Sequence, residues 1–160
     1  MLTKAQTYDQ VFSRIDALLS EPTDWVAAMA TVVCELHHSF DTYHWTGFYR
    51  TVRKNHLQVG PYQGGHGCID IPFDRGVCGA AARTKSTQLV HDVNVFPGHI
   101  ACSSTTVSEI VVPVLTPDGK VLAVLDVDSN WEGSFDQIDQ QYLELLCSRL
   151  GRDYQKEALY

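Results

Sequence analysis

Three of the five cysteines stand in loop-like sequence, where a thiol has little to contribute to packing. Cys68, Cys78 and Cys102 lie among glycines and small polar residues, and Cys102 belongs to the stretch HIACSST. Backbone N–H groups and hydroxyls stabilise a thiolate, and a second thiol close by converts a sulfenic acid into a disulfide. The pattern therefore favours redox chemistry, with Cys102 as its centre.

Zinc binding is the alternative use of these thiols. Structural zinc sites normally contain close C-x-x-C pairs, whereas the three loop cysteines are ten and then twenty-four residues apart. His66 and His99 could complete a tetrahedral set, but the spacing does not require one. Cys34 and Cys147 differ from the loop cysteines because they stand in helical patterns beside apolar residues, so we expect both to be small buried side chains.

Acidic residues mark the second chemical feature. Asp126 and Asp128 alternate with apolar residues in VLDVDS, so they share one face of a strand. Glu109 opens the neighbouring apolar run, and we expect it to join them. Crowded carboxylates raise one another's pKa, so that one can stay protonated as a general acid while the others suit an ammonium group. For Asp128, a simple turn at the strand end is the alternative interpretation.

Aromatic residues precede these acids in the segment HWTGFYRTV, residues 44–52. Core packing is the default role of such side chains, above all for Phe48. Trp45 and Tyr49 could instead form an aromatic wall beside the acids, which would hold a small methyl or thioether group.

Hydrophobic spacing predicts the helices that support these segments. One helix spans about 8–19 and a second about 24–38, and Asp136 with Asp139 can cap a last helix. The expected buried faces of the first and last helices are Tyr8, Val11, Phe12, Ile15, Leu18 and Leu19, and Ile138, Tyr142, Leu145, Leu146 and Leu150.

Between the helices the sequence predicts strands. Residues 44–52 and the segment LQVGPYQG form one predicted hairpin. A second predicted hairpin consists of EIVVPVL and KVLAVLDVD, which the turn TPDG joins. The segment TQLVHDV is a further predicted strand, and GVCGAAART is a predicted short helix. This order predicts an α+β fold, in which the terminal helices cover one face of an antiparallel sheet and loops with the short helix cover a pocket on the other. We expect one domain over 1–160, with two helices in 5–40, the sheet and active-site loops in 44–130 and a helix in 135–158.

Composition limits the partners. The net charge of −7 and the lack of a basic cluster argue against nucleic acid, and no apolar run is long enough to cross a membrane. The first residues do not resemble an export signal, so we expect a cytoplasmic protein with reduced thiols, and nothing in the sequence calls for a cofactor.

Several segments in order resemble the free methionine-(R)-sulfoxide reductase family, which is built on a GAF domain. They are GPYQG (60–64), CIDIPF (68–73), GVCGAAA (76–82), QLVHDV (88–93), FPGHIAC (96–102), SEIVVPV (108–114) and AVLDVDS (123–129). The resemblance implies reduction of free L-methionine (R)-sulfoxide, with thioredoxin as the reductant. It also allows a homodimer, because GAF domains often pair through their terminal helices.

The resemblance assigns a role to each candidate residue. Cys102 would be the nucleophile that becomes a sulfenic acid, and Cys68 or Cys78 would resolve it to a disulfide. Glu109, Asp126 and Asp128 would bind the sulfoxide oxygen and the ammonium group, and Trp45 and Tyr49 would line the methyl pocket. Two other functions stay open: a GAF-type module that binds a small ligand without turnover, and a redox sensor whose cysteines respond directly to peroxide.

Overall fold

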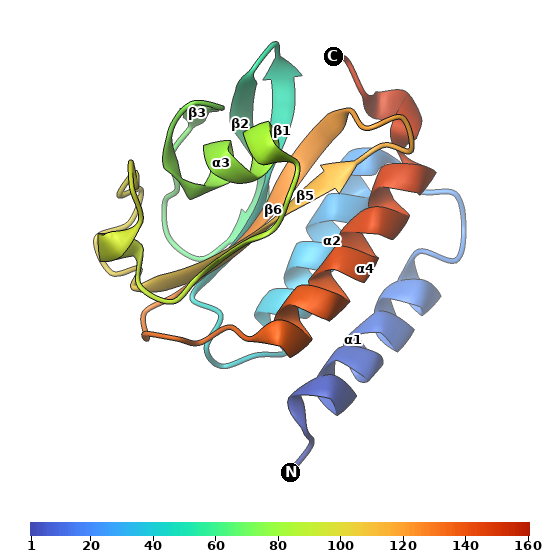
Figure 1. Ribbon diagram of the computed structural model, residues 1–160. Helices are drawn as coiled ribbons and strands as arrows, with labels where there is room; N and C mark the ends of the chain where they lie inside the picture. The colour runs from blue at the N-terminus through green and yellow to red at the C-terminus, as the bar shows by residue number, and fades with distance from the viewer.

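The computed structural model describes residues 1–160, and its elements follow the predicted order (Figure 1). They are α1 (Lys4–Leu18), α2 (Trp25–His37), β1 (Trp45–Arg53), β2 (His56–Gln63), β3 (Asp70–Pro72), α3 (Gly76–Thr84), β4 (Gln88–Val90), η1 (Val93–Val95), β5 (Ser108–Leu115), β6 (Val121–Ser129), α4 (Gln137–Asp153) and η2 (Gln155–Glu157). The short strand β3 was not predicted. Helix α4 ends at Asp153, before the expected limit of 158.

The long helices begin at residues whose side chains accept hydrogen bonds from the first turn. The Thr3 side chain does this for α1, and the Asp24 carboxylate does it for α2. Asp136 and Asp139 form the predicted capping box of α4, in which each side chain accepts from the backbone of the other residue. These caps satisfy N–H groups that would otherwise have no partner.

The six strands form one antiparallel sheet in the order β3-β2-β1-β6-β5-β4. Helix α2 packs on β1 and β2, α4 packs on β5, and α1 lies over both helices (Figure 1). Helix α3 lies on the opposite face, against β5 and β6, together with the loop that leads to β5. The predicted α+β architecture, with terminal helices on one face, is confirmed.

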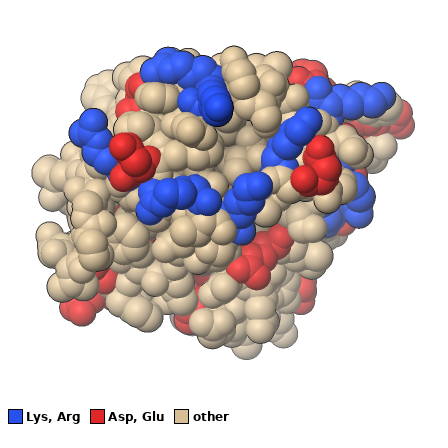
Figure 2. Space-filling view, turned by 45° about the horizontal axis from the view of Figure 1, so that its top comes forward, with Lys and Arg blue, Asp and Glu red and all other residues tan.

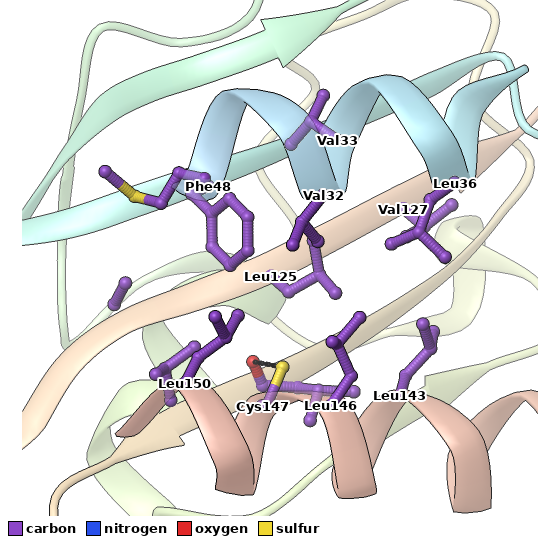
Figure 3. Close-up of a cluster of buried hydrophobic side chains, with 14 of the residues drawn as sticks. Val32, Val33, Leu36, Phe48, Leu125, Val127, Leu143, Leu146, Cys147 and Leu150 are labelled. Atoms are coloured by element: carbon purple, nitrogen blue, oxygen red, sulfur yellow. Dashed lines mark hydrogen bonds between the residues drawn. The ribbon is translucent and has the colours of Figure 1, made fainter. Parts of the chain in front are cut away.

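Each face of the sheet has its own apolar core. Figure 3 shows the helix-side core, in which side chains of α2 and α4 pack against side chains of β1 and β6. The labelled side chains are Val32, Val33, Leu36, Phe48, Leu125, Val127, Leu143, Leu146, Cys147 and Leu150. A second core under α3 includes Tyr49, Val77, Val111 and Val124. The alternation of β6 therefore places Leu125 and Val127 in the helix-side core, and Asp126 and Asp128 on the α3 side.

Three residues expected on buried helix faces are exposed, and the prediction was wrong for them. Leu18 is 58% exposed, Leu145 is 53% exposed and Ile138 is 38% exposed. Leu146 and Leu150 are buried as expected, but the side of α4 that packs against β5 is rotated from the predicted one, so that it also buries Leu143 and Cys147. Gly151 shows how close this contact is, since a Cβ there would lie 1.8 Å from the Leu115 carbonyl oxygen.

The two helical cysteines differ in burial. Cys147 is buried as expected, and its thiol points toward the Val112 carbonyl oxygen (Figure 3). Cys34 is exposed on α2, so the prediction of a buried side chain was wrong there. Its neighbours Val32 and Val33 face the core, and the turn of the helix carries Cys34 to the outside.

Positive and negative side chains share the surface that Figure 2 shows. Around the β1–β2 turn and the β5–β6 turn, Arg53 pairs with Asp70 and Lys120 pairs with Asp118. None of the helices has the length and apolar character that crossing a bilayer requires.

Candidate active site

Strand register brings the predicted site residues together. Trp45 of β1 pairs with Asp128 of β6, and Asp128 pairs in turn with Glu109 of β5. Asp126 lies two residues away on the same face of β6. Because side chains alternate along a strand, all four residues face the α3 side of the sheet, where they line one pocket.

The three acids form a compact group in that pocket. One carboxylate oxygen from each of Glu109, Asp126 and Asp128 lies within 4.8 Å of the others. Glu109 and Asp126 are each 5% exposed. One oxygen of Asp126 and one of Asp128 are buried without a hydrogen-bond partner. Unpartnered buried oxygens are costly, so they favour a ligand that brings donors.

Burial and mutual repulsion keep this group partly protonated. Burial, followed by the charges of Asp126 and Asp128, raises the pKa of Glu109 well above its usual range. Burial and the charge of Asp128 do the same to the pKa of Asp126. Burial raises the pKa of Asp128 to about 7, although hydrogen bonds with Glu109 and Thr106 oppose the shift. The cluster can therefore donate a proton near neutral pH and also bind a cation.

The predicted aromatic wall stands beside the acids. Trp45 and Tyr49 are buried and stack with their ring centroids 5.6 Å apart. The Trp45 indole donates to the Gly65 carbonyl at 3.0 Å, which fixes its orientation. Gly67 lets the loop approach closely, because a Cβ there would lie 2.7 Å from the Tyr49 hydroxyl. The rings thus form an apolar side of the pocket.

Cys68 and Cys102 form a disulfide, with their Cα atoms 5.0 Å apart. Both residues are half-buried, and Cys102 lies in the wall of the pocket. A backbone hydrogen bond of 3.0 Å from Gly76 N–H to the Gly98 carbonyl ties the Cys102 loop to the start of α3. Gly98 has φ +75°, a conformation that favours glycine. The disulfide therefore bridges two loops that both border the acids.

Cys78 lines the same pocket but is a free thiol. It lies in the first turn of α3, where every residue from Gly76 to Ala82 is buried. Burial, and then the nearby charge of Asp126, raises the pKa of the Cys78 thiol well above its usual value. The structure thus brings all three loop cysteines to one site and joins only two of them.

The structure does not assemble the alternative zinc site. The one group of three convergent ligand-type side chains contains only the carboxylates. His66 and His99 both line the pocket, but neither completes a set with the cysteines.

Two pocket residues were missed as site residues by sequence reasoning. His99 Nε2 lies 3.9 Å from Glu109 Oε1, although His99 was considered only as a zinc ligand. Thr106 lines the pocket beside Asp128. His99 stands three residues before Cys102, and Thr106 stands three residues before Glu109. This closeness in sequence to two candidate residues is the signal that could have marked them.

Fold and site together define a GAF domain that carries a disulfide beside an acidic pocket. The family model described as "GAF domain" matches residues 21–152, so the chain belongs to the GAF domain family.

Within that family, the chain is homologous over nearly its full length to free methionine-R-sulfoxide reductases. The protein of that name from Saccharomyces cerevisiae is 40% identical over 94% of this chain and 87% of its own length. The one from Escherichia coli is 35% identical over 97% and 96%. The structure of the Neisseria meningitidis enzyme, in complex with its substrate, superposes with a TM-score of 0.91 at 40% identity, over 98% of this chain and 93% of that one.

Proposed function

We propose that this chain reduces free L-methionine (R)-sulfoxide to L-methionine, and that thioredoxin reduces the enzyme between turnovers. The observation that carries the proposal is the Cys68–Cys102 disulfide beside a pocket with three convergent buried carboxyls. Homology to enzymes named for this reaction supports the choice of substrate.

The reaction begins at Cys102. Its thiolate attacks the sulfoxide sulfur, and a protonated carboxyl of the acid cluster gives its proton to the sulfoxide oxygen. The oxygen passes to Cys102 as a sulfenic acid and methionine leaves. The substrate sulfur gains the two electrons that the Cys102 sulfur loses.

Cys68 completes the cycle. Its thiol loses its proton and attacks the sulfenic sulfur of Cys102, the sulfenic hydroxyl takes up a proton and leaves as water, and a disulfide forms. Exchange with a dithiol such as thioredoxin restores both thiols. The half-buried position of Cys68 and Cys102 gives this reductant access to the bond.

Two ends of the pocket suit the two charged groups of a free amino acid. The carboxylates of the acid cluster attract the ammonium group. The first turn of α3 has no side-chain cap, and Val77 and Cys78 line the pocket there, so their N–H groups suit the substrate carboxylate. A methionine sulfoxide inside a protein lacks both charged groups, so we expect the enzyme to leave it unreduced.

Substrate entry requires the thiol form. In the disulfide-bonded form the pocket has a volume of about 30 Å³, which is room for about one water molecule. An amino acid needs more space, so the loop that carries Cys102 must move away from Cys68 after reduction.

The test is methionine release from the separated R and S diastereomers of free L-methionine sulfoxide, with thioredoxin supplied, for wild type and Cys102→Ser. We expect wild type to reduce only the R form and Cys102→Ser to reduce neither. If wild type binds the ligand but releases no methionine, a sensor function replaces the enzyme.

A further inference from the structure

The residues beside the disulfide form an apolar patch on the surface. Ile69 follows Cys68 directly and is 66% exposed, and Ala101 precedes Cys102 and is also exposed. None of the neighbours of the two cysteines carries a charge: they are Gly67, Ile69, Ala101 and Ser103. Single exposed apolar residues are common on proteins, but Ile69 and Ala101 flank the bond that an external reductant must reach.

Strand pairing fixes the side of the sheet on which Ile69 lies. The Ile69 carbonyl accepts a hydrogen bond of 3.0 Å from the Val59 N–H, which continues the pairing of β3 with β2 by one residue. Ile71, two residues further along, is buried in the core under α3 and lines the pocket. Because side chains alternate along a strand, Ile69 lies on the same side of the sheet as Ile71. Its backbone is already ordered, so contact with a partner costs little conformational entropy.

The charges near this patch distinguish between two kinds of reductant. Asp70, the residue after Ile69, pairs with Arg53 at 2.9 Å, and no Lys or Arg lines the pocket beside Cys102. Glutathione carries two carboxylates, and basic side chains would be needed to recognise them. The patch instead suits a protein whose reactive thiol stands in an apolar surface.

Disulfide exchange brings such a protein against the patch. A thiolate of the reductant attacks one sulfur of the Cys68–Cys102 bond, that bond breaks, and the other sulfur leaves as a thiolate and takes up a proton. The second thiol of the reductant then loses its proton and attacks the mixed disulfide. The reductant leaves as a disulfide, and the second cysteine of this chain is released as a thiolate that also takes up a proton.

The mixed disulfide limits the distance between the two proteins. The Cα atoms of two bonded cysteines lie about 4.4–6.8 Å apart, and consecutive Cα atoms in a chain lie about 3.8 Å apart. Whichever sulfur is attacked, the Cα atom of Ile69 or of Ala101 therefore lies within about 11 Å of that of the reductant's cysteine. Redox encounters bury small interfaces, below about 1,200 Å² in total, so a residue this close to the bond lies near the centre.

We propose that Ile69 is the central contact of a docking surface for a dithiol protein of the thioredoxin type, and that its side chain is buried against that protein while the Cys68–Cys102 bond is reduced. The inference rests on the proposed function, because that function requires an external dithiol. It adds the surface that the dithiol protein recognises, which Ile69 and Ala101 form with the two cysteines.

Ile69→Asn tests docking apart from chemistry, because thioredoxin needs a surface on which to dock and dithiothreitol does not. Each reagent reduces the disulfide-bonded chain, and the thiols that appear are counted against time. With thioredoxin, we expect Ile69→Asn to lower the second-order rate constant about fivefold or more, as is typical for losing an apolar contact at the centre of an interface. With dithiothreitol the rate constant should stay within twofold of wild type. Ile69→Leu keeps the apolar contact and should keep both rate constants within twofold.

Val26→Asn is the matched control. Val26 is also branched at Cβ and is 54% exposed, but it lies in the first turn of α2, on the opposite face of the sheet. Neither of its rate constants should change beyond twofold. Equal losses with both reagents in Ile69→Asn would mean that Ile69 acts on the disulfide itself, and an unchanged rate with thioredoxin would mean that Ile69 is not contacted. Either result overturns the inference.

These rates are measured without a sulfoxide, so they are independent of the reaction that we propose. Methionine formation from free L-methionine (R)-sulfoxide, with dithiothreitol as the reductant, tests that reaction. A wild type that forms no methionine contradicts the proposed function, whereas the Ile69 rates still decide the docking surface. If dithiothreitol reduces the wild-type disulfide and thioredoxin does not, the docking surface is refuted even where methionine is formed.

Discussion

Asp128 on β6 lies directly opposite Glu109 on β5, and both side chains enter the same pocket. Two adjacent carboxyls in register normally repel each other, and here Asp126 adds a third within 4.8 Å. Neither Lys nor Arg lines this pocket to offset them. The arrangement therefore carries a cost in stability that depends on pH.

Replacing Asp128 by Asn should reduce that dependence. An unfolded Asp has a pKa of about 3.9, whereas burial raises the pKa of Asp128 to about 7. Between these values the folded protein binds a proton that the unfolded chain does not bind. The contribution of Asp128 to the free energy of unfolding is therefore fully present below about pH 4 and is lost as the pH rises through about 7.

We expect the free energy of unfolding of wild type to fall relative to Asp128→Asn by about 2–3 kcal/mol between about pH 5 and about pH 8. Urea unfolding of the disulfide-bonded proteins at both pH values measures this difference. Asp41→Asn, at an exposed position, is the control. Parallel pH curves for wild type and Asp128→Asn would contradict the prediction.

Replacing Cys68 by Ser should separate the first turnover from all later ones. Cys102 keeps its role as nucleophile, but its sulfenic acid has no resolving thiol. Rapid quenching of the reduced variant with excess substrate should show one methionine per chain, followed by a rate at least tenfold below that of wild type. Sustained turnover at the wild-type rate with thioredoxin would show that Cys68 is not needed.

The disulfide-bonded form should bind substrate poorly, because its pocket has a volume of only about 30 Å³. Methionine, the product, is a suitable probe because it does not react with the enzyme. Calorimetric titration should detect binding to the reduced protein, and an affinity at least tenfold lower for the oxidised protein. Equal affinity in the two redox states would mean that the loop does not close the pocket.

Replacing Gly47 by Ala should displace Trp45. A Cβ at Gly47 would lie 2.6 Å from the Trp45 ring and 2.5 Å from the Tyr62 Cβ. We expect a loss of about 1–3 kcal/mol in the free energy of unfolding, together with weaker substrate binding. Gly65→Ala is the matched control, because a Cβ there would have no atom within 4 Å. Tryptophan fluorescence and urea unfolding test both variants, and identical behaviour of the two would refute the prediction.

The sequence alone determined the features that depend on neighbours along the chain. The alternation in VLDVDS already placed Asp126 and Asp128 on one face, and the Asp136–Asp139 box already marked the start of α4. Helix and strand periods are local properties, so the architecture could be read from them. The family motifs added the expected substrate and the role of each candidate residue.

The tertiary structure decided the features that depend on contacts between distant segments. Register between β5 and β6 brought Glu109 opposite Asp128, and loop packing joined Cys102 to Cys68, 34 residues away, while α3 kept Cys78 apart. The same reason explains why Cys34 is exposed and Cys147 is buried. A helical pattern shows that an apolar face exists, but the helix's rotation against the sheet decides which residues that face buries.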